Sequence, residues 1–254
     1  MPAEVEKYAF KLVKKIRIRI LDIPGAFGQL ATELGKYGAM LGDITKVHLT
    51  SQHITRDMVM FFDSRDQLEN TLQDIEKLKG YRILSVEDVV LNLHRGGKVA
   101  VTPTVKMETL SDLRLLYTPG VAQACRHLAE HPEETRDFTS IGNTVCIATN
   151  GTAVLGLGDI GVLAGMPVME GKAVILHRMA GVSCVPLLLD TRDVSRIVNT
   201  LETLSKTFSL VMIEDIKAPE CFEIEEKLQE RLSIPVFHDD QHGTATVILA
   251  TLIK

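Results

Sequence analysis

The sequence predicts an α/β protein with two domains, and two patterns carry the prediction. Between residues 15 and 93, alternating apolar runs and helical patterns follow one another in the order strand, helix, strand, strand, helix, strand. That order predicts a ferredoxin-like βαββαβ domain over residues 1–94. Over residues 95–254, apolar runs that end in acidic residues alternate with helical patterns, which predicts a mostly parallel α/β domain.

Composition places the chain among soluble globular proteins. Of its 254 residues, 45% are hydrophobic and 24% are charged, which is enough to build a substantial core. The net charge of −5 and the absence of tryptophan argue against a nucleic-acid partner. The four scattered cysteines form neither a disulfide framework nor a zinc motif, and no apolar run is long enough to span a membrane. We therefore expect a cytoplasmic protein.

Apolar spacing and capping residues define the elements of the first domain. Pro24 and Gly25 open one helix, and Ser64 is placed to cap the other, with Gln67 as its capping-box partner. The expected elements are a strand at 15–21, a helix through 27–37, strands at 40–50 and 54–62, a helix at 65–79 and a strand at 83–93. The segment 94–98 is rich in glycine and basic residues, so we expect it to be the linker.

The second domain is expected to alternate helices with buried strands. Thr118 and Pro119 suit the cap and first position of a helix that runs to about residue 129. The expected elements after it are a helix within 169–182, a strand at 184–189, a helix through 194–204, a strand at 210–213, a helix through 219–232 and a strand at 235–237. The last two strands flank a helix, so they should be parallel, with both carboxyl ends at one edge of the sheet.

Paired acids end both of these last strands. Glu214 and Asp215 follow the first strand, and Asp239 and Asp240 follow the second. Four carboxylates crowded at one edge repel one another unless a cation neutralises them, and hard divalent cations prefer oxygen ligands. We therefore predict that three of the four hold Mg²⁺ or Mn²⁺. The alternative is that these acids are solvated turn residues.

The segment 152–161 contains the pattern Gly-x-Gly-x-x-Gly after an apolar run, which is the dinucleotide-binding fingerprint on paper. Its context is missing, because Gly165 and Pro167 occupy the place where a helix should open at once. A turn that approaches a small anion or a neighbouring loop is the favoured interpretation. A true nucleotide site is a third hypothesis, which tight NAD binding abolished by Gly158→Val would support.

Two further side chains are candidates for proton transfer. Tyr117 lies just outside an expected helix N-terminus, where its phenol could donate a proton to a bound anion; the alternative is that it packs as a hydrophobic staple. Lys172 lies near the start of an expected helix, and a lysine turned inward there would have a lowered pKa and could act as a base. The alternative for Lys172 is an exposed side chain.

The stretch LDIPGAFGQLATEL (21–34), in its βαββαβ setting, resembles the ACT domain, a small regulatory module. The resemblance covers about the first ninety residues and implies an amino-acid effector, often bound at a dimer interface. The loop at Asp22, Pro24 and Gly25 would hold it, because glycine lets a ligand approach the backbone and the helix N-terminus can receive a carboxylate. The alternative is a unit that only dimerises.

Four ordered motifs in residues 95–254 resemble the substrate-binding half of malic enzyme. The motifs are LLYTPGVA (115–122), GTAVLGLGDIG (151–161), PVMEGKAVIL (167–176), and IEDIKAP (213–219) with FHDDQHGTA (237–245). The resemblance implies metal ligands at Glu214, Asp215 and Asp240, a general acid at Tyr117, a general base at Lys172, and support of that lysine by Asp239. One departure is the stretch 152–154, which lacks the arginine that holds the substrate carboxylate in larger relatives, so another group must replace it.

The resemblance also implies a function and a missing part. A malic enzyme oxidises malate with NAD or NADP and decarboxylates the product to pyruvate, with Mg²⁺ or Mn²⁺ as a Lewis acid. The family continues into a Rossmann domain that binds the nicotinamide cofactor and is absent here, so we expect a truncated chain that is inactive alone and, by family, at least a homodimer. One alternative is a malolactic enzyme, which yields lactate. Another is an amino-acid-sensing ACT module joined to an α/β remnant without chemistry.

Overall fold

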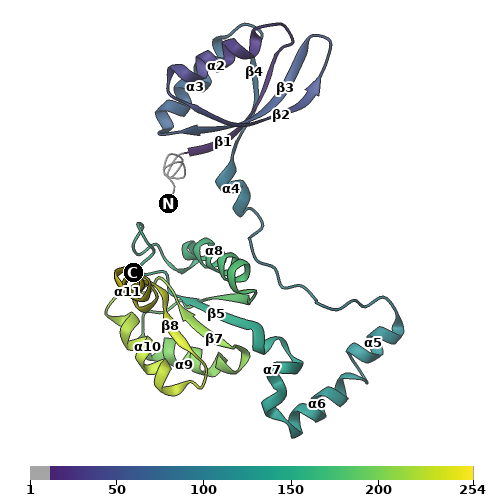
Figure 1. Ribbon diagram of the computed structural model, residues 1–254, viewed down its shortest axis with the longest axis vertical. Helices are drawn as coiled ribbons and strands as arrows, with labels where there is room; N and C mark the ends of the chain where they lie inside the picture. The colour runs from purple at the N-terminus through teal and green to yellow at the C-terminus, as the bar shows by residue number, and fades with distance from the viewer. Residues whose placement is uncertain (1–11, 254) are drawn as a thin grey trace. The chain divides into compact units, whose positions relative to one another are not determined.

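The computed structural model describes residues 12–253, and the chain divides into two compact units. Unit 1 runs up to Gly96 and unit 2 begins at Gly97, so the division falls inside the predicted linker 94–98. Figure 1 shows the elements of both units. Among the described residues, no helix is both long and apolar enough to cross a membrane.

Unit 1 has the βαββαβ order that the sequence predicts. Its elements are β1 (Leu12–Leu21), α2 (Ala26–Lys36), β2 (Met40–Leu49), β3 (His53–Phe62), α3 (Arg65–Lys77), β4 (Arg82–Asp88) and α4 (Val89–His94). One boundary differs, because the sequence predicts that the last strand runs to residue 93. It ends at Asp88, whose side chain accepts a hydrogen bond from the backbone N–H of Leu91 at 2.8 Å and so caps α4.

The four strands of unit 1 form one antiparallel sheet in the order β2-β3-β1-β4. Because side chains alternate between the faces of a strand, Ile16, Ile18 and Ile20 of β1 share one face, and Lys15, Arg17 and Arg19 share the other. The helices α2 and α3 pack on the first face, where Ile18, Leu30 and Ile75 are fully buried in one core. The opposite face carries Arg17 and Asp57, which form a two-bonded ion pair.

Unit 2 is built around a parallel sheet in the order β6-β5-β7-β8. Its elements are α5 (Leu110–Leu116), α6 (Val121–Glu130), η1 (Pro132–Glu134), α7 (Thr135–Phe138), η2 (Ser140–Asn143), β5 (Thr144–Thr149), α8 (Val162–Ala180), β6 (Ser183–Leu188), α9 (Val194–Leu204), η3 (Ser205–Thr207), β7 (Leu210–Ile213), α10 (Glu220–Arg231), β8 (Val236–His238), the π-helix η4 (Asp239–Gly243) and α11 (Thr244–Ile253).

Helices cover both faces of this parallel sheet, as buried parallel strands require. On one face α8 contributes Met169 and Ala173 to a core with Ile147. On the other face α9 and α10 pack against a second core that includes Ile197 and Leu228. The predicted mostly parallel α/β arrangement is thereby confirmed.

Helix α8 corrects one prediction about its own limits. The sequence predicts a helix only within 169–182, because Gly165 and Pro167 should interrupt it, whereas α8 begins at Val162 directly after Gly161. Gly165 is buried against Gly151. Its missing side chain lets the helix and this loop pack closely, and it does not end the helix. Lys172 consequently lies inside α8 rather than near its start.

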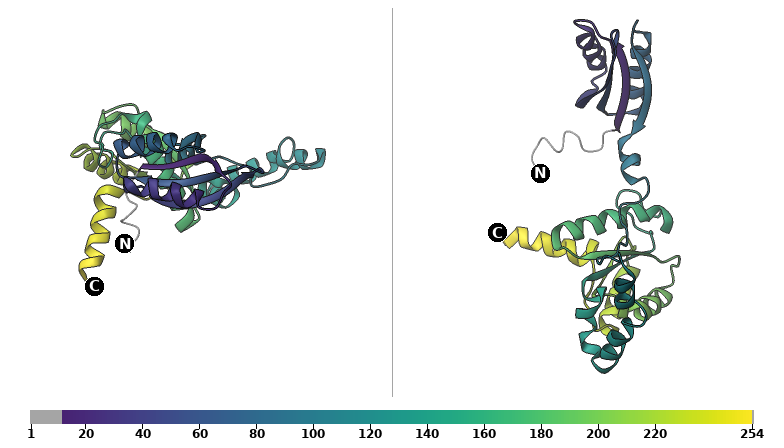
Figure 2. Two further views of the ribbon diagram at one scale, coloured as in Figure 1. Left: turned by 90° about the horizontal axis from the view of Figure 1, so that it is seen from above. Right: turned by 90° about the vertical axis from the view of Figure 1, so that its right-hand side faces the viewer.

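A helical segment before the sheet also differs from the prediction. Figures 1 and 2 show α5 and α6 standing away from the sheet of unit 2. Helix α6 begins at Val121, not at Pro119, and Tyr117 is the C-terminal cap of α5. The turn between them is tight, because the backbone N–H of Gly120 donates to the carbonyl of Arg114 and a Cβ on Gly120 would lie 2.5 Å from that oxygen.

Candidate functional site

Four acidic residues meet at the carboxyl edge of the parallel sheet. Strands β7 and β8 are parallel neighbours, and Ile213 pairs with His238 at their ends. Residues 214–215 and 239–240 therefore leave the sheet at the same edge, as the sequence predicts. Glu214 and Asp215 are buried, at 3% exposed each, so these two acids are not the solvated turn residues of the alternative.

Lys172 reaches this cluster from α8. Its Nζ lies 2.6 Å from Oδ2 of Asp239 and 3.0 Å from Oε1 of Glu214. On the other side of the cluster, the backbone N–H of Asp215 donates to Oδ2 of Asp240 at 3.0 Å. The structure thus brings together five of the predicted site residues from three elements: α8, the loop after β7, and η4.

The electrostatics of the cluster are unbalanced, because several carboxylates share the one lysine. Burial raises the pKa of Glu214 to about 7, and the contact with Lys172 opposes this only in part. Burial raises the pKa of Asp215 to about 6, and the neighbouring carboxylate of Asp240 contributes in the same direction. The site therefore holds more negative charge than its own side chains neutralise.

The lysine differs from the expectation of a lowered pKa. Burial of Lys172 by itself would lower its pKa, but the hydrogen bonds to Asp239 and Glu214 outweigh burial, and the pKa is raised. The sequence-based argument considers only the helix start and burial, and it omits the two carboxylates that contact the ammonium group. Any change that neutralises these carboxylates would favour release of the lysine proton.

The residues present fit a divalent cation. Oε2 of Glu214 and Oδ2 of Asp215 are buried and have no hydrogen-bond partner within the described chain. Glu214, Asp239 and Asp240 each offer an oxygen atom, and these three atoms lie within 4.8 Å of one another. Buried carboxylate oxygens without partners, next to a converging set of oxygens, are the donor set that Mg²⁺ and Mn²⁺ prefer.

The backbone at Asp215 is held in an unusual conformation. Asp215 has a φ of 53°, in the left-handed region, and it is the only such non-glycine residue in the described part of the chain. Both its backbone groups are used, because the N–H donates to Asp240 and the carbonyl accepts from the N–H of Ala153 at 3.0 Å. Such conformations persist where neighbouring contacts impose them, and they concentrate at functional sites.

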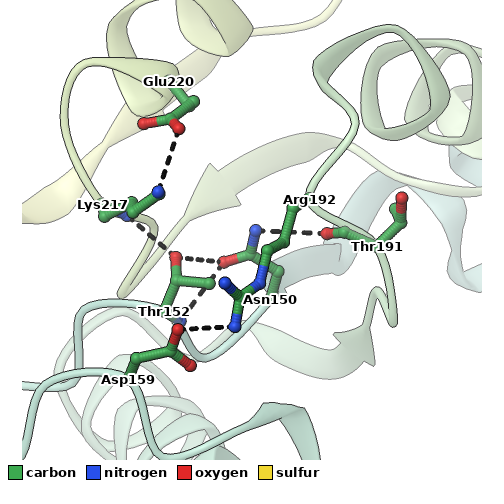
Figure 3. Close-up of polar contacts among 7 residues, drawn as sticks. All are labelled: Asn150, Thr152, Asp159, Thr191, Arg192, Lys217 and Glu220. Carbon is green, nitrogen blue, oxygen red and sulfur yellow. Dashed lines mark hydrogen bonds and ion pairs between the residues drawn. The ribbon is translucent and has the colours of Figure 1, made fainter.

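A polar brace, defined as Asn150, Thr152, Thr191 and Lys217, joins three loops at the same sheet edge (Figure 3). The Asn150 amide donates to the carbonyl of Thr191 at 3.2 Å and accepts from the hydroxyl of Thr152 at 2.6 Å. That hydroxyl in turn accepts from the backbone N–H of Lys217 at 3.1 Å. Sequence reasoning missed this brace, although the position of Asn150 just after β5 was the available signal.

The glycine-rich loop lies between β5 and α8, and Arg192 meets it. The guanidinium of Arg192 lies 2.6 Å from Oδ2 of Asp159 (Figure 3). The loop spans residues 150–161, so the glycines do not form the tight strand-to-helix turn of a dinucleotide site. This geometry favours the predicted role as a turn that places backbone near a neighbour.

Two other predicted positions lie apart from the acid cluster. Tyr117 is 66% exposed and belongs to the α5–α6 segment, which stands away from the sheet (Figure 1). In unit 1 the predicted effector loop at Asp22, Pro24 and Gly25 is exposed. Gly25 has a φ of 84° and is the N-cap residue of α2, which receives no side-chain cap hydrogen bond. The structure therefore leaves both roles as predictions.

Comparison with known proteins identifies relatives of both the sequence and the fold. The family described as malic enzyme, N-terminal domain, matches residues 96–229. NAD-dependent malic enzyme 1 of Bacillus subtilis (strain 168) is 42% identical over 96% of this chain and 56% of its own length. The bifunctional malic/malolactic enzyme of the same organism is 48% identical over 67% of this chain and 42% of its own length.

Solved structures agree with the sequence relatives. The NAD-dependent malic enzyme of Thermotoga maritima matches 66% of this chain and 48% of its own chain, with a TM-score of 0.63 and 42% identity. The malic enzyme of Pyrococcus horikoshii Ot3 matches 62% of this chain and 36% of its own, with a TM-score of 0.60 and 45% identity. The chain spans about half the length of the full-chain relatives that it matches.

Proposed function

We propose that this chain, which belongs to the malic enzyme family, is the metal- and substrate-binding part of an enzyme that oxidises and decarboxylates malate. The observation that carries the proposal is the buried acid cluster with two unpartnered carboxylate oxygens, in direct contact with Lys172. The names of the relatives supply the substrate class, and the cluster supplies the chemistry that malate needs. The metal, the effector and the oligomeric state belong to the same proposal.

The proposed metal ligands are Glu214, Asp215 and Asp240. A divalent cation bound there would supply Lewis-acid polarisation of the substrate hydroxyl and carboxylate. The fourth acid, Asp239, orients the lysine, because its Oδ2 lies 2.6 Å from Nζ of Lys172. Lys172 contacts both Asp239 and Glu214, so the proposed base lies directly beside the proposed metal ligands.

Lys172 is the proposed general base, and Asp239 sets its position. The raised pKa of this lysine is caused by its two carboxylate neighbours, so compensation of their charge frees the proton-accepting form. Lys172 then takes the proton of the malate hydroxyl. The hydride requires a nicotinamide cofactor as acceptor, and we assign no residue of this chain to that cofactor.

Tyr117 is the proposed general acid, which protonates the enol form of pyruvate at its methylene carbon after CO₂ has left. Its support is the motif LLYTPGVA. The phenol is exposed, so no buried packing opposes a movement of this side chain. For Tyr117 to act, the α5–α6 segment must approach a cluster from which it stands apart (Figure 1). Tyr117→Phe should therefore reduce turnover without changing metal affinity.

The test is a calorimetric Mn²⁺ titration with and without malate, for the wild type and Asp215→Asn. We expect saturable Mn²⁺ binding that malate strengthens and that Asp215→Asn weakens about a hundredfold, because the substitution removes an anionic ligand oxygen. The matched control is Asp193→Asn, on the exposed N-terminal cap of α9 at the same side of the sheet. Equal affinity of wild type and Asp215→Asn would contradict the proposal.

A malolactic outcome is the second candidate, and one relative favours it. That relative, 48% identical over 173 residues, is named for both malic and malolactic activity. The two reactions share the metal and the base and differ in the product. Chromatographic separation of pyruvate from lactate in a reaction supplied with malate and NAD decides between them.

Unit 1 is proposed to be a regulatory ACT domain. The support is its βαββαβ order and the exposed loop at Asp22, Pro24 and Gly25, which leaves the first N–H groups of α2 without a side-chain cap. An amino-acid carboxylate would occupy that position. Calorimetry with a panel of amino acids, repeated on Gly25→Ala, tests this: binding lost in the variant supports it, and the absence of binding to any member leaves a unit that only dimerises.

We further propose a cytoplasmic homodimer. All four cysteines are free in the structure, which suits a reducing compartment. The dimer rests on the two family resemblances, and light scattering of the purified chain tests it.

A further inference from the structure

A buried carboxylate outside the proposed reaction contacts the segment that carries Asp239 and Asp240. Glu225 belongs to α10 and is 2% exposed. Its Oε1 accepts from the backbone N–H of His238 at 2.9 Å, and its Oε2 lies 2.7 Å from Nδ1 of His242. Gln229 adds a longer contact to Oε1 at 3.4 Å. Both oxygens of Glu225 are therefore committed to donors in one neighbouring segment and its own helix.

The two main partners of Glu225 bracket the acids of the site. His238 is the last residue of β8, and His242 lies within η4, so Asp239 and Asp240 are among the residues between them along the chain. The segment η4 is a single π-helical turn, which does not hold its shape by the regular α-helical ladder and is found mostly at functional sites. Because Glu225 accepts hydrogen bonds near both ends of this turn, it also fixes the positions of Asp239 and Asp240.

A second contact shows how tightly the turn is set. A Cβ on Gly243 would lie 2.9 Å from Oδ1 of Asp239, so the Asp239 carboxylate rests against the end of the turn. That same carboxylate reaches Lys172 through Oδ2 at 2.6 Å. The position of Asp239 therefore depends on where the far end of η4 lies, and Glu225 holds that end through His242.

We propose that Glu225 is a positioning residue for the metal site, which sets the π-turn that presents Asp239 and Asp240. The inference rests on the proposed function, since it assigns an anchor to the site described there. Glu225 contacts neither substrate nor reacting atoms and acts only through the backbone of His238 and the ring of His242. Helix α10 is already held to the sheet by Cys221, Ile224 and Leu228, so the helix needs no carboxylate at this position to pack.

The competing interpretation is that Glu225 merely satisfies a buried backbone N–H and has no effect on the site. The two interpretations differ in metal binding. Outer partners of metal ligands affect affinity by roughly tenfold to a hundredfold when they are removed. A purely structural contact lowers the melting temperature but leaves the affinity and the spectrum of the metal bound to the folded fraction unchanged.

The experiment measures Mn²⁺ binding by electron paramagnetic resonance in the wild-type chain, Glu225→Ala and Glu225→Gln. The controls are Glu226→Ala and Glu226→Gln, because Glu226 is exposed on the same helix. Free Mn²⁺ gives the dissociation constant, the bound signal reports the coordination geometry, and circular dichroism gives the folded fraction. We expect about a tenfold loss of affinity for Glu225→Ala, with an altered bound spectrum. Glu225→Gln, whose amide oxygen can still accept from His238, should lie between alanine and wild type.

Each outcome decides the matter. Affinity of folded Glu225→Ala within twofold of Glu226→Ala would overturn the inference. Should Glu225→Ala not fold, Glu225→Gln decides in its place: at least a twofold loss relative to Glu226→Gln supports the inference, and a smaller one overturns it. Failure of the wild type itself to bind Mn²⁺ would overturn both the proposed metal site and the positioning role of Glu225. Wild-type affinity in both Glu225 variants would overturn the positioning role alone.

Discussion

The two units each bury acidic side chains, on a strand in unit 1 and just after a strand in unit 2, and the pKa values of these acids are shifted in opposite directions. In unit 1, Asp57 on β3 accepts two hydrogen bonds from Arg17 at 2.6 and 2.9 Å and pairs with Lys15 at 3.1 Å. Its pKa is lowered to about 2, chiefly by the bond to Arg17. In unit 2, burial raises the pKa of Glu214 to about 7 and that of Asp215 to about 6.

The difference lies in how far each negative charge is compensated within the chain. Asp57 has two cationic partners and needs nothing more, so it serves stability. Glu214 and its acidic neighbours share one lysine, and two of their buried oxygens have no partner within the described chain. The folded chain alone therefore stabilises their negative charge poorly. An acid that its own protein leaves uncompensated is a candidate for a ligand, and one that is fully paired is not.

The largest expected effect is the stabilisation of the folded chain by Mn²⁺, which should depend on Glu214 and not on Asp57. Saturating Mn²⁺ at about 100 times its dissociation constant should stabilise the wild type by about 2.7 kcal/mol, because it binds only the folded state. Glu214→Gln should abolish this stabilisation, since it removes a charged ligand. It should not destabilise the metal-free chain, since Lys172 compensates this buried charge only in part and keeps its contact with Asp239. Thermal melting with and without Mn²⁺ measures both. A metal-free Glu214→Gln that melts several degrees below the wild type would break the comparison.

A smaller and opposite effect is expected for the paired acid. Asp57→Asn should destabilise unit 1 by about 2 kcal/mol, because an amide cannot compensate Arg17 and Lys15. Mn²⁺ stabilisation should remain as in the wild type. The matched control is Asp43→Asn, an exposed acid in the same unit. Hydrogen exchange of peptides covering β1 and β3, in increasing urea, measures the local stability, and protection equal to that of the control would contradict the assignment.

The same pair predicts a pH dependence with a definite sign. The pKa of Asp57 in the folded chain, about 2, lies below its ordinary value of 3.8, so the unfolded state binds more protons between these values. The stabilisation, about 2 kcal/mol by linkage, is complete above about pH 4 and is lost as the pH falls toward 2. Exchange protection of β1 and β3 across this range should fall in the wild type. In Asp57→Asn this component of the fall should be absent, and equal slopes in both proteins would contradict it.

Much of this arrangement could be predicted from the sequence, because it depends on periodicity along the chain. The βαββαβ order follows from apolar spacing, and the meeting of residues 214–215 with 239–240 follows from two acid-ended parallel strands. What could not be predicted depends on packing between distant elements. The raised pKa of Lys172 requires the contacts to Asp239 and Glu214, which no local pattern contains.

Glu225 shows where sequence reasoning could have gone further. In the run ECFEIEEKLQER it looks like one more solvated glutamate of an acidic helix. Its spacing of four residues from Cys221 nevertheless places it on the buried face, beside Leu228 at three residues further. Gly165 and Pro167 show the opposite error, since both residues favour a helix end by local rules and both lie within α8 because tertiary packing holds it.

The smallest expected effects compare one glycine from each unit. Gly28 lies exposed in α2, and a Cβ there would meet nothing within 4 Å, so Gly28→Ala should stabilise unit 1 by up to about 1 kcal/mol. Gly243 ends η4, and its added Cβ would lie 2.9 Å from Oδ1 of Asp239. Gly243→Ala should therefore shift that carboxylate, which offers an oxygen within 4.8 Å of those of Glu214 and Asp240, and weaken Mn²⁺ binding severalfold. Melting and Mn²⁺ titration of both variants test the pair. If Gly243→Ala bound Mn²⁺ as the wild type does, the metal site would tolerate movement of the turn. The two glycines would then no longer distinguish a unit that serves stability from a site that serves a ligand.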